Sequence, residues 1–274
     1  MDTGYSVLMS VYKKEQPEFL KESIQSIMDQ TLKTDNFVLV CDGALTKELD
    51  QVIEEFEKKN PGIFFILRLE TNKGLGVALQ KGLFYCKHDL VARMDSDDIA
   101  KPYRCEKQID VFCRKGVDIV SSTIEEFYKS PGDRKVYKTL PEEQEAIVEY
   151  ARTRNPFNHP AVMFRKTAVE QVNGYQPFYL LEDYYLWVRM LKNGARAYNI
   201  QESLLYMRVG EGMYHRRGGI KYFWSLYCLY NYMRKTHFCS DFDFVKIISG
   251  YFFMCVLPEK IREKIYTRKL RRNL

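Results

Sequence analysis

Three aspartates follow an apolar stretch of the chain closely. Asp95, Asp97 and Asp98 come directly after residues 90–94, which read as a buried strand. Carboxylates at this spacing repel one another, and a divalent cation would relieve the repulsion. Carboxylate oxygens suit Mg²⁺ or Mn²⁺, which keep positions open for substrate phosphate oxygens. The alternative is an acidic turn that caps the next helix, since Asp is a good N-cap, and this short pattern leaves both interpretations open.

A second acidic pair, Glu182 and Asp183, stands at the expected start of a helix over residues 181–191. Acids in a first helical turn are favoured by the helix dipole, so a structural role would explain them. In the functional interpretation, a carboxylate here is a base that deprotonates an acceptor hydroxyl, and the adjacent aromatic side chains stack on a sugar.

Other polar motifs each have two interpretations. The basic, glycine-rich stretch 208–219 is typical of a loop that closes over a diphosphate, and equally of a solvated loop. His159 precedes Pro160 and is either a cleft residue or a packed histidine. Residues 72–74, Asn-Lys-Gly, match no complete phosphate-binding pattern and by themselves indicate only a flexible loop.

The elements that must position these residues alternate in the first half of the chain. Apolar runs predict strands over 5–12, 37–41, 63–67, 90–94 and 117–121, and periodic stretches predict helices over 17–28, 46–59, 75–85 and 102–114. This alternation predicts an α/β fold with a mostly parallel sheet and helices on both faces. Ligands bind such sheets beyond the carboxyl ends of the strands, so the polar residues 13–15, 42–43 and 95–98 are expected in one crevice.

The second half of the chain is less regular. Strands are expected over 159–164 and 198–208, and helices from residue 219 onward. The near-apolar run 247–257 is too short to span a bilayer, which takes about 20 residues.

Most of the net charge of +6 lies at the C-terminal end. Residues 258–274 contain seven Lys or Arg and two Glu, which gives +5 and leaves about +1 for the rest of the chain. A nearly neutral body argues against a nucleic-acid-binding domain and, with a basic tail, fits contact with anionic lipid. Residues 242–257 and the apolar positions 261, 265 and 270 suggest an interfacial element; the alternative is a C-terminal helix packed on the domain.

Seven scattered cysteines form no CxxC pair, which predicts neither a disulfide framework nor a zinc site and favours a reducing compartment. The first residues run directly into a strand, and we expect no secretory signal and a cytoplasmic protein.

The polar motifs, taken in order, resemble those of the family 2 glycosyltransferases, which have the GT-A fold. The resemblance covers nearly the whole chain. It rests on residues 6–12, Asp42-Gly43, Asn72-Lys73-Gly74, residues 92–98, His159-Pro160 and Glu182-Asp183. The stretch 206–219 is similar to the members that build bacterial exopolysaccharide, capsule or lipopolysaccharide units. In one departure, Asn173-Gly174 stands where the family often has a Gly-Gly pair.

The resemblance implies inverting transfer of a sugar from a nucleotide diphosphate, by family habit a UDP-sugar, to a glycan or a polyprenyl-diphosphate-linked saccharide. It implies that Asp183 is the catalytic base with Glu182 beside it, and that Asp97 is the main ligand of Mn²⁺ or Mg²⁺, with Asp95 and Asp98 nearby. Residues expected beside the nucleotide are Ser10, Val11, Tyr12, Glu15, Asp42 (to uracil), Lys73, Arg93 and Asp95, with Arg208 and His215 near the diphosphate.

The expected organisation is a catalytic domain over 1–218, with a nucleotide-binding half (1–122) and an acceptor-binding half (123–218). A helical extension over 219–274 would contact the cytoplasmic face of the inner membrane. A sugar nucleotidyltransferase is an alternative, but residues 13–17 lack the glycine expected after its first strand. A non-catalytic nucleotide-sugar-binding module would not need both Asp97 and Asp183, and a glycosidase has no use for a diphosphate site.

Overall fold

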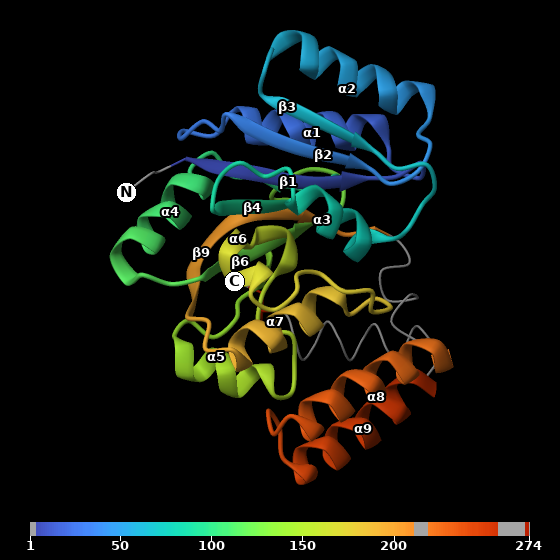
Figure 1. Ribbon diagram of the computed structural model, residues 1–274, viewed down its shortest axis with the longest axis vertical. Coiled ribbons are helices and arrows are strands. Elements are labelled where there is room, and N and C mark those ends of the chain that lie inside the picture. The colour runs from blue at the N-terminus through green and yellow to red at the C-terminus, as the bar shows by residue number, and fades with distance from the viewer. Residues whose placement is uncertain (1–3, 211–218, 257–271, 274) are drawn as a thin grey trace.

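The structure, a computed structural model, describes residues 4–210, 219–256 and 272–273 (Figure 1). The expectations for His215 and for an amphipathic helix over 261–270 lie outside these residues.

Four parallel strands form one end of a ten-stranded sheet. They are β1 (Tyr5–Val11), β2 (Asn36–Cys41), β3 (Phe64–Arg68) and β4 (Leu90–Asp95), in the order β4-β1-β2-β3. Ser10 lies opposite Val40 on β2 and opposite Asp95 on β4. The carboxyl ends of these strands are therefore level with one another, and the polar residues that follow them meet at one edge.

The rest of the sheet is mixed. Its strands are β5 (Ile99–Ala100), β6 (Ile119–Phe127), β7 (Val136–Lys138), β8 (Met163–Arg165), β9 (Ala197–Arg208) and β10 (Arg272–Asn273). β8 lies antiparallel between β4 and β6, while β9 runs parallel to β6 and antiparallel to β5. β10 pairs with β7, which places the end of the basic tail against the sheet.

The prediction of a strand over 159–164 was wrong for its first half. His159–Ala161 form a 3₁₀ helix, and only Met163–Arg165 are extended. Pro160 lacks an N–H and has a fixed φ, so it suits the start of a helical turn better than a ladder position.

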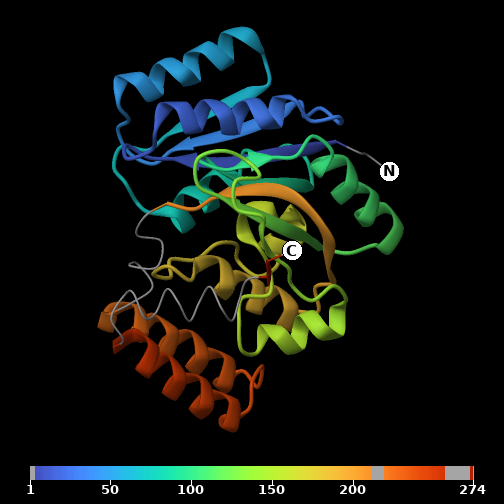
Figure 2. The same ribbon diagram turned by 180° about the vertical axis from the view of Figure 1, so that it is seen from behind.

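Helices cover both faces of the sheet, as expected (Figures 1 and 2). One face packs against α1 (Pro17–Met28), α2 (Lys47–Lys59) and α4 (Arg104–Lys115), and the other against α3 (Leu75–Leu83), α5 (Gln144–Ala151), α6 (Lys166–Glu170) and α7 (Glu182–Lys192). Each face has its own buried apolar cluster, which contains Leu20, Leu49 and Ile109 on the first side and Ala78 and Trp187 on the second.

The chain after β9 forms two antiparallel helices, α8 (Gly219–Lys235) and α9 (Asp241–Val256) (Figure 1). Leu226, Leu229 and Met233 of α8 belong to the same core as Trp187 of α7, so this extension packs directly on the α/β part of the chain. The domain boundary at 218/219 stays a prediction. None of the helices in the described ranges is long and apolar enough to cross a membrane.

Candidate active site

The polar segments that follow β1, β2 and β4 lie at one edge of the sheet. The Asp42 N–H donates to the Val11 carbonyl, 2.8 Å away, and the Ser96 hydroxyl donates to the Glu15 carboxylate. Glu15 is thereby held beside the acidic turn, although the two are 81 positions apart. The three polar segments expected to lie together are therefore found at the carboxyl ends of the parallel strands.

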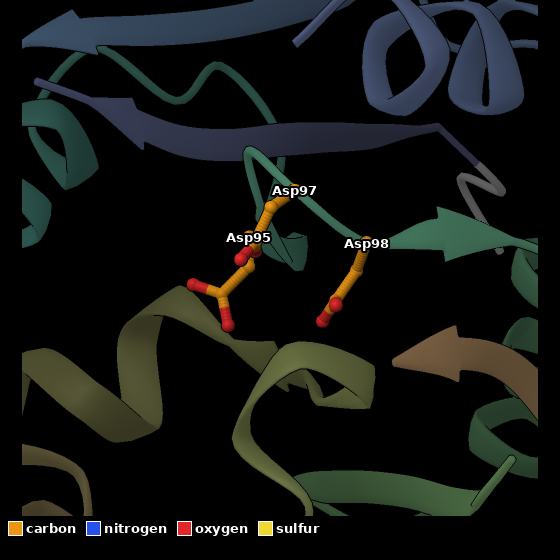
Figure 3. Close-up of side chains that lie close together, drawn as sticks. All are labelled: Asp95, Asp97 and Asp98. Carbon is orange, nitrogen blue, oxygen red and sulfur yellow. The ribbon is translucent and has the colours of Figure 1, made fainter. Parts of the chain in front are cut away.

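The acidic cluster consists of Asp95 at the end of β4 and of Asp97 and Asp98 in the turn before β5 (Figure 3). One carboxylate oxygen from each lies within 4.8 Å of the others. Burial, and then the charges of Asp95 and Glu15, raise the pKa of Asp97 to about 7. Crowded, partly buried carboxylates of this kind are a suitable donor set for Mg²⁺ or Mn²⁺.

Asp98 is the most deeply buried member of the cluster, at 1% exposure. Burial, and then the charge of Asp97, raises its pKa well above the ordinary value. Its Oδ1 accepts a hydrogen bond of 2.8 Å from the Arg208 N–H, whereas Oδ2 has no hydrogen-bond partner among the described residues. A buried carboxylate oxygen is costly to leave unpaired, and a cation would satisfy it.

Arg93 is a buried cation that influences both groups of acids. It is 1% exposed and forms an ion pair with Asp95. Its charge also acts on Asp98, Glu182 and Asp183. Its Nε and Nη1 have no hydrogen-bond partner within the described part of the chain. The charge of Arg93 therefore acts both on the acidic cluster Asp95, Asp97 and Asp98 and on the expected base. Its contact with a nucleotide stays a prediction.

Glu182 and Asp183 occupy the first turn of α7. The Asp183 side chain is 17% exposed, and its Oδ2 accepts a 2.7 Å hydrogen bond from the Asn155 amide. Burial raises the pKa of Asp183, while hydrogen bonds from the Tyr184 N–H and from Asn155 lower it in part. Burial and then the charge of Asp183 raise the pKa of Glu182 to about 7. A carboxylate with a raised pKa is suited to accept a proton near neutral pH.

Sequence reasoning missed Asn155. It lies 28 positions before Asp183 and in no motif that the sequence analysis singled out. The loop between α5 and the 3₁₀ helix packs against α7, with the Phe157 and Trp187 ring centroids 5.6 Å apart, and this packing brings the two together.

Of the two alternatives for His159, a cleft residue or a packed histidine, the structure shows a packed histidine. Its ring lies 5.9 Å from the Trp187 ring, and its Nε2 is 3.0 Å from the Tyr175 hydroxyl. Burial lowers the pKa of His159 well below its ordinary value, so the ring is neutral. Its Nδ1 lies 3.9 Å from Asp183 Oδ2, which places it behind the base as support.

Asp42 fixes the loop before α3. Its Oδ1 accepts a 2.7 Å hydrogen bond from the Lys73 N–H, and its Oδ2 accepts one of 2.9 Å from the Gly74 N–H. Gly74 has φ +87°, a conformation that favours glycine. Asp42 is only 4% exposed, whereas Tyr12, at the end of β1, is 41% exposed. The nucleotide contacts expected for Ser10, Val11, Tyr12, Glu15, Asp42 and Lys73 stay predictions.

Arg208 supports the acidic turn from behind. Its guanidinium lies 3.8 Å from the centre of the Phe19 ring, pairs with Glu22 at 2.6 Å, and donates from Nε to the Asp97 carbonyl at 2.9 Å. With only 6% of its side chain exposed, Arg208 is engaged within the protein. Its expected contact with a diphosphate stays a prediction.

The Asn173-Gly174 pair keeps the backbone shape that two glycines would allow. Both residues lie in the left-handed region, with φ of 60° and 63°, and Asn tolerates this region better than most residues. Arg189 donates to the carbonyls on either side of Asn173, which ties this loop to α7. At Gly76 on α3, an added Cβ would lie 3.1 Å from the Cβ of Glu182, so glycine there allows the acidic pair to approach α3 closely.

A sheet whose parallel strands carry an acidic cluster after β4, together with a half-buried acidic pair that opens α7, is the arrangement expected of a glycosyltransferase. The profile of "Glycosyl transferase family 2" matches residues 6–172, and the chain belongs to this family.

Relatives support the same assignment over nearly the full length. The chain is 41% identical over 271 residues to "UDP-Gal:alpha-D-GlcNAc-diphosphoundecaprenol beta-1,3-galactosyltransferase" of Escherichia coli, covering 98% of both chains. It is 39% identical over 268 residues to "Amylovoran biosynthesis glycosyltransferase AmsE" of Erwinia amylovora, covering 96% of this chain and 98% of the relative.

Two solved structures share the fold. TarS 1–349 of S. aureus in complex with UDP-GlcNAc matches with a TM-score of 0.64 at 16% identity, over 97% of this chain and 71% of that one. The mannosyltransferase PcManGT of Pyrobaculum calidifontis in complex with GDP-Man and Mn²⁺ matches with a TM-score of 0.64 at 14% identity, over 97% and 75%. The expected GT-A fold is thus confirmed.

Proposed function

We propose that this glycosyltransferase uses a divalent cation and transfers a hexose or N-acetylhexosamine from a UDP-sugar, with inversion, to a lipid-linked saccharide in bacterial surface polysaccharide synthesis. The observation that carries the proposal is the arrangement around Arg93. This buried cation pairs with Asp95 of the acidic cluster, and its charge also acts on Glu182 and Asp183. Such a site can hold a diphosphate leaving group close to a base.

The relatives narrow the substrates to test first. The Escherichia coli relative is named for UDP-galactose and for a GlcNAc-diphosphoundecaprenol acceptor. Identity of 41% over nearly the whole chain supports the same donor and acceptor classes here. Galactosyl transfer is therefore the first reaction to examine.

Asp183 would accept the proton of the attacking hydroxyl. Asn155 and the Tyr184 N–H hold its carboxylate in place, and its raised pKa suits proton transfer near neutral pH. Attack opposite the departing diphosphate inverts the anomeric centre without a covalent enzyme intermediate. Asp97, with Asp95 and Asp98, would hold the cation, which when bound offsets negative charge on the leaving group.

An acceptor of this kind places the enzyme at the cytoplasmic face of the inner membrane. The seven Lys and Arg residues between positions 258 and 274 would add attraction to anionic lipid. The pairing of Arg272–Asn273 with β7 holds this end of the described chain against the sheet.

A donor screen tests the proposal. Purified protein with Mn²⁺ or Mg²⁺ is given a panel of nucleotide sugars, and nucleoside diphosphate release is measured with and without GlcNAc-diphospholipid. Asp97→Ala and Asp183→Ala are expected to abolish release. Asp110→Ala, which removes an exposed aspartate paired only with Arg114, is the matched control and should leave release unchanged.

The outcomes separate the functions. Release of UDP that requires both metal and acceptor, and is lost in the two site variants, supports the transferase. Pyrophosphate release from UTP and a sugar phosphate would instead reveal a nucleotidyltransferase. Tight donor binding without turnover of any acceptor would favour a binding module.

A further inference from the structure

Exposed apolar side chains gather at one end of the α8–α9 pair. Ile220 and Trp224, one helical turn apart on α8, are 77% and 61% exposed, and Phe253 on α9 is 69% exposed. The Phe223 and Phe252 rings contact each other with centroids 5.5 Å apart, which brings the end of α9 against the start of α8. Isolated exposed apolar residues are ordinary, but a contiguous group marks an interaction surface.

The helix α9 is apolar on both faces. Its inward side, with Ile247, Ile248 and Tyr251, packs against the core. Its outward side carries Phe242 and Val245, which are 75% and 61% exposed. Apolar side chains on two sides of a helix are normally both covered, whereas the described residues cover only one side of α9.

This exposed surface continues to the loop that leads into the expected base. The Ser225 hydroxyl donates to the Tyr179 carbonyl at 2.7 Å, and the Lys221 ammonium lies 4.0 Å above the Tyr179 ring. Tyr179 and Leu180 are themselves 46% and 37% exposed, and they come directly before the Leu181–Asp183 segment. The apolar surface and the catalytic pair therefore belong to one connected structure.

We propose that this surface docks on an anionic lipid bilayer. It consists of Tyr179, Leu180, Ile220, Trp224, Phe252 and Phe253, and is called the docking face below. Trp and Tyr rings beside a Lys are typical of the boundary between headgroups and acyl chains. The sequence that follows α9 carries a charge of +5 over residues 258–274, which is complementary to anionic lipid and not to a second copy of this basic chain.

Docking in this way has a consequence for catalysis. Because Leu180 of the docking face lies two residues before Glu182, the bilayer surface would lie next to the expected base, at the level where a diphosphate-linked sugar leaves the headgroups. This part of the proposal rests on the proposed lipid-linked acceptor. Binding to the bilayer itself does not.

Vesicle flotation of the full chain tests the docking face. The vesicles contain phosphatidylglycerol and phosphatidylethanolamine, and zwitterionic phosphatidylcholine vesicles are the comparison. The double variant Trp224→Ser/Phe253→Ser should partition roughly tenfold or more weakly, since interfacial binding follows buried apolar area. Both side chains are exposed, so folding is expected to be preserved, which the melting temperature checks. Phe84→Ser removes a ring that is 77% exposed on another surface and should bind like the unmodified protein.

Unchanged partitioning of the double variant would overturn the proposal. So would a dimer in sedimentation that the double variant abolishes while vesicle binding persists, since the face would then bind a second copy. A second measurement compares an acceptor embedded in vesicles with a short-chain, water-soluble acceptor. The double variant should lose activity only toward the embedded acceptor. If the unmodified protein binds vesicles but turns over neither acceptor, the proposed function fails while the docking face stands.

Discussion

Removal of the Asn155 amide should shift the pH dependence of the reaction. The amide nitrogen donates to Asp183 Oδ2 at 2.7 Å, and this hydrogen bond lowers the pKa of a carboxyl that burial raises. Asn155→Ala removes the donor, so the pKa of Asp183 should rise further. The ionised base would then be present only at higher pH.

The size of the shift follows from the contact. A hydrogen bond to a charged group contributes roughly 1.5–3 kcal/mol, and one pKa unit corresponds to about 1.4 kcal/mol, which gives about one to two units. The side chain of Asp183 is 17% exposed, so water replaces part of the lost bond and a shift of about one unit is expected. At pH values below the pKa of Asp183, kcat/KM of the variant should be about tenfold lower than that of the unmodified enzyme, whereas the plateau at high pH should be similar for both.

The assay is kcat/KM for the acceptor between about pH 5 and pH 9 at saturating donor. Asn155 Oδ1 also accepts a 3.3 Å hydrogen bond from the Phe157 N–H, which Asn155→Ala removes as well. Asn155→Asp keeps that acceptor but places a negative charge beside the base, so its limb should move further upward. A plateau that falls in both variants without any movement of the limb would refute the reasoning and make Asn155 a purely structural residue.

Three further predictions concern stability and donor binding. Burial and the charge of Asp183 raise the pKa of Glu182 to about 7, so the folded state binds a proton more tightly than the unfolded chain. The protonated Glu182 therefore stabilises the folded state below about pH 4.5, and this stabilisation is lost as the pH rises through about 7. Glu182→Gln removes the titrating group. In EDTA, its melting temperature should therefore fall less between these two pH values than that of the unmodified protein. Gly82→Ala would place a Cβ 2.6 Å from two core side chains and should lower the free energy of unfolding by about 1–3 kcal/mol, measured by urea titration. Gly250→Ala is the control, because the space around Gly250 is open, and it should not lower this free energy. Equal effects of the two substitutions would contradict the packing explanation. Asp42→Ala leaves two backbone N–H groups without their acceptor and should weaken the binding of the nucleotide sugar, measured by calorimetry, about tenfold. A loss of preference for UDP over GDP in this variant would indicate that Asp42 also contacts the uracil ring. Unchanged affinity would exclude both the loop-ordering role and the uracil contact.

The early part of the fold was predictable because its elements are determined locally. Alternating apolar runs and amphipathic periods placed β1 to β4 and the helices between them to within about two residues. The acidic cluster was also visible, since its three aspartates are neighbours in the chain and the end of a parallel strand is a fixed place in such a sheet. The strand at 159–164 failed because Pro160 started a 3₁₀ turn in a stretch whose composition also suited a strand.

Relations between distant segments were decided by the tertiary structure. The carboxylate of Asp42 accepts hydrogen bonds from residues more than 30 positions away and orders the loop before α3, a role that the sequence did not indicate. Two aromatic rings and Glu22 enclose the guanidinium of Arg208, which the sequence did not indicate either; the nucleotide contacts expected for both residues stay predictions. The partner of a long polar side chain depends on which surfaces meet, and periodicity carries no information about that.

The sequence by itself determined the family, the parallel half of the sheet and the acidic residues, because each depends on residue types at short, ordered spacing. The tertiary structure decided that Arg93 joins the two acidic groups, that Asn155 holds Asp183, and that α8 connects an exposed apolar surface to the loop before the base. These relations arise from long-range packing in a water-poor interior. There, each buried charge needs a partner, and the chain supplies it from whichever segment the fold brings near.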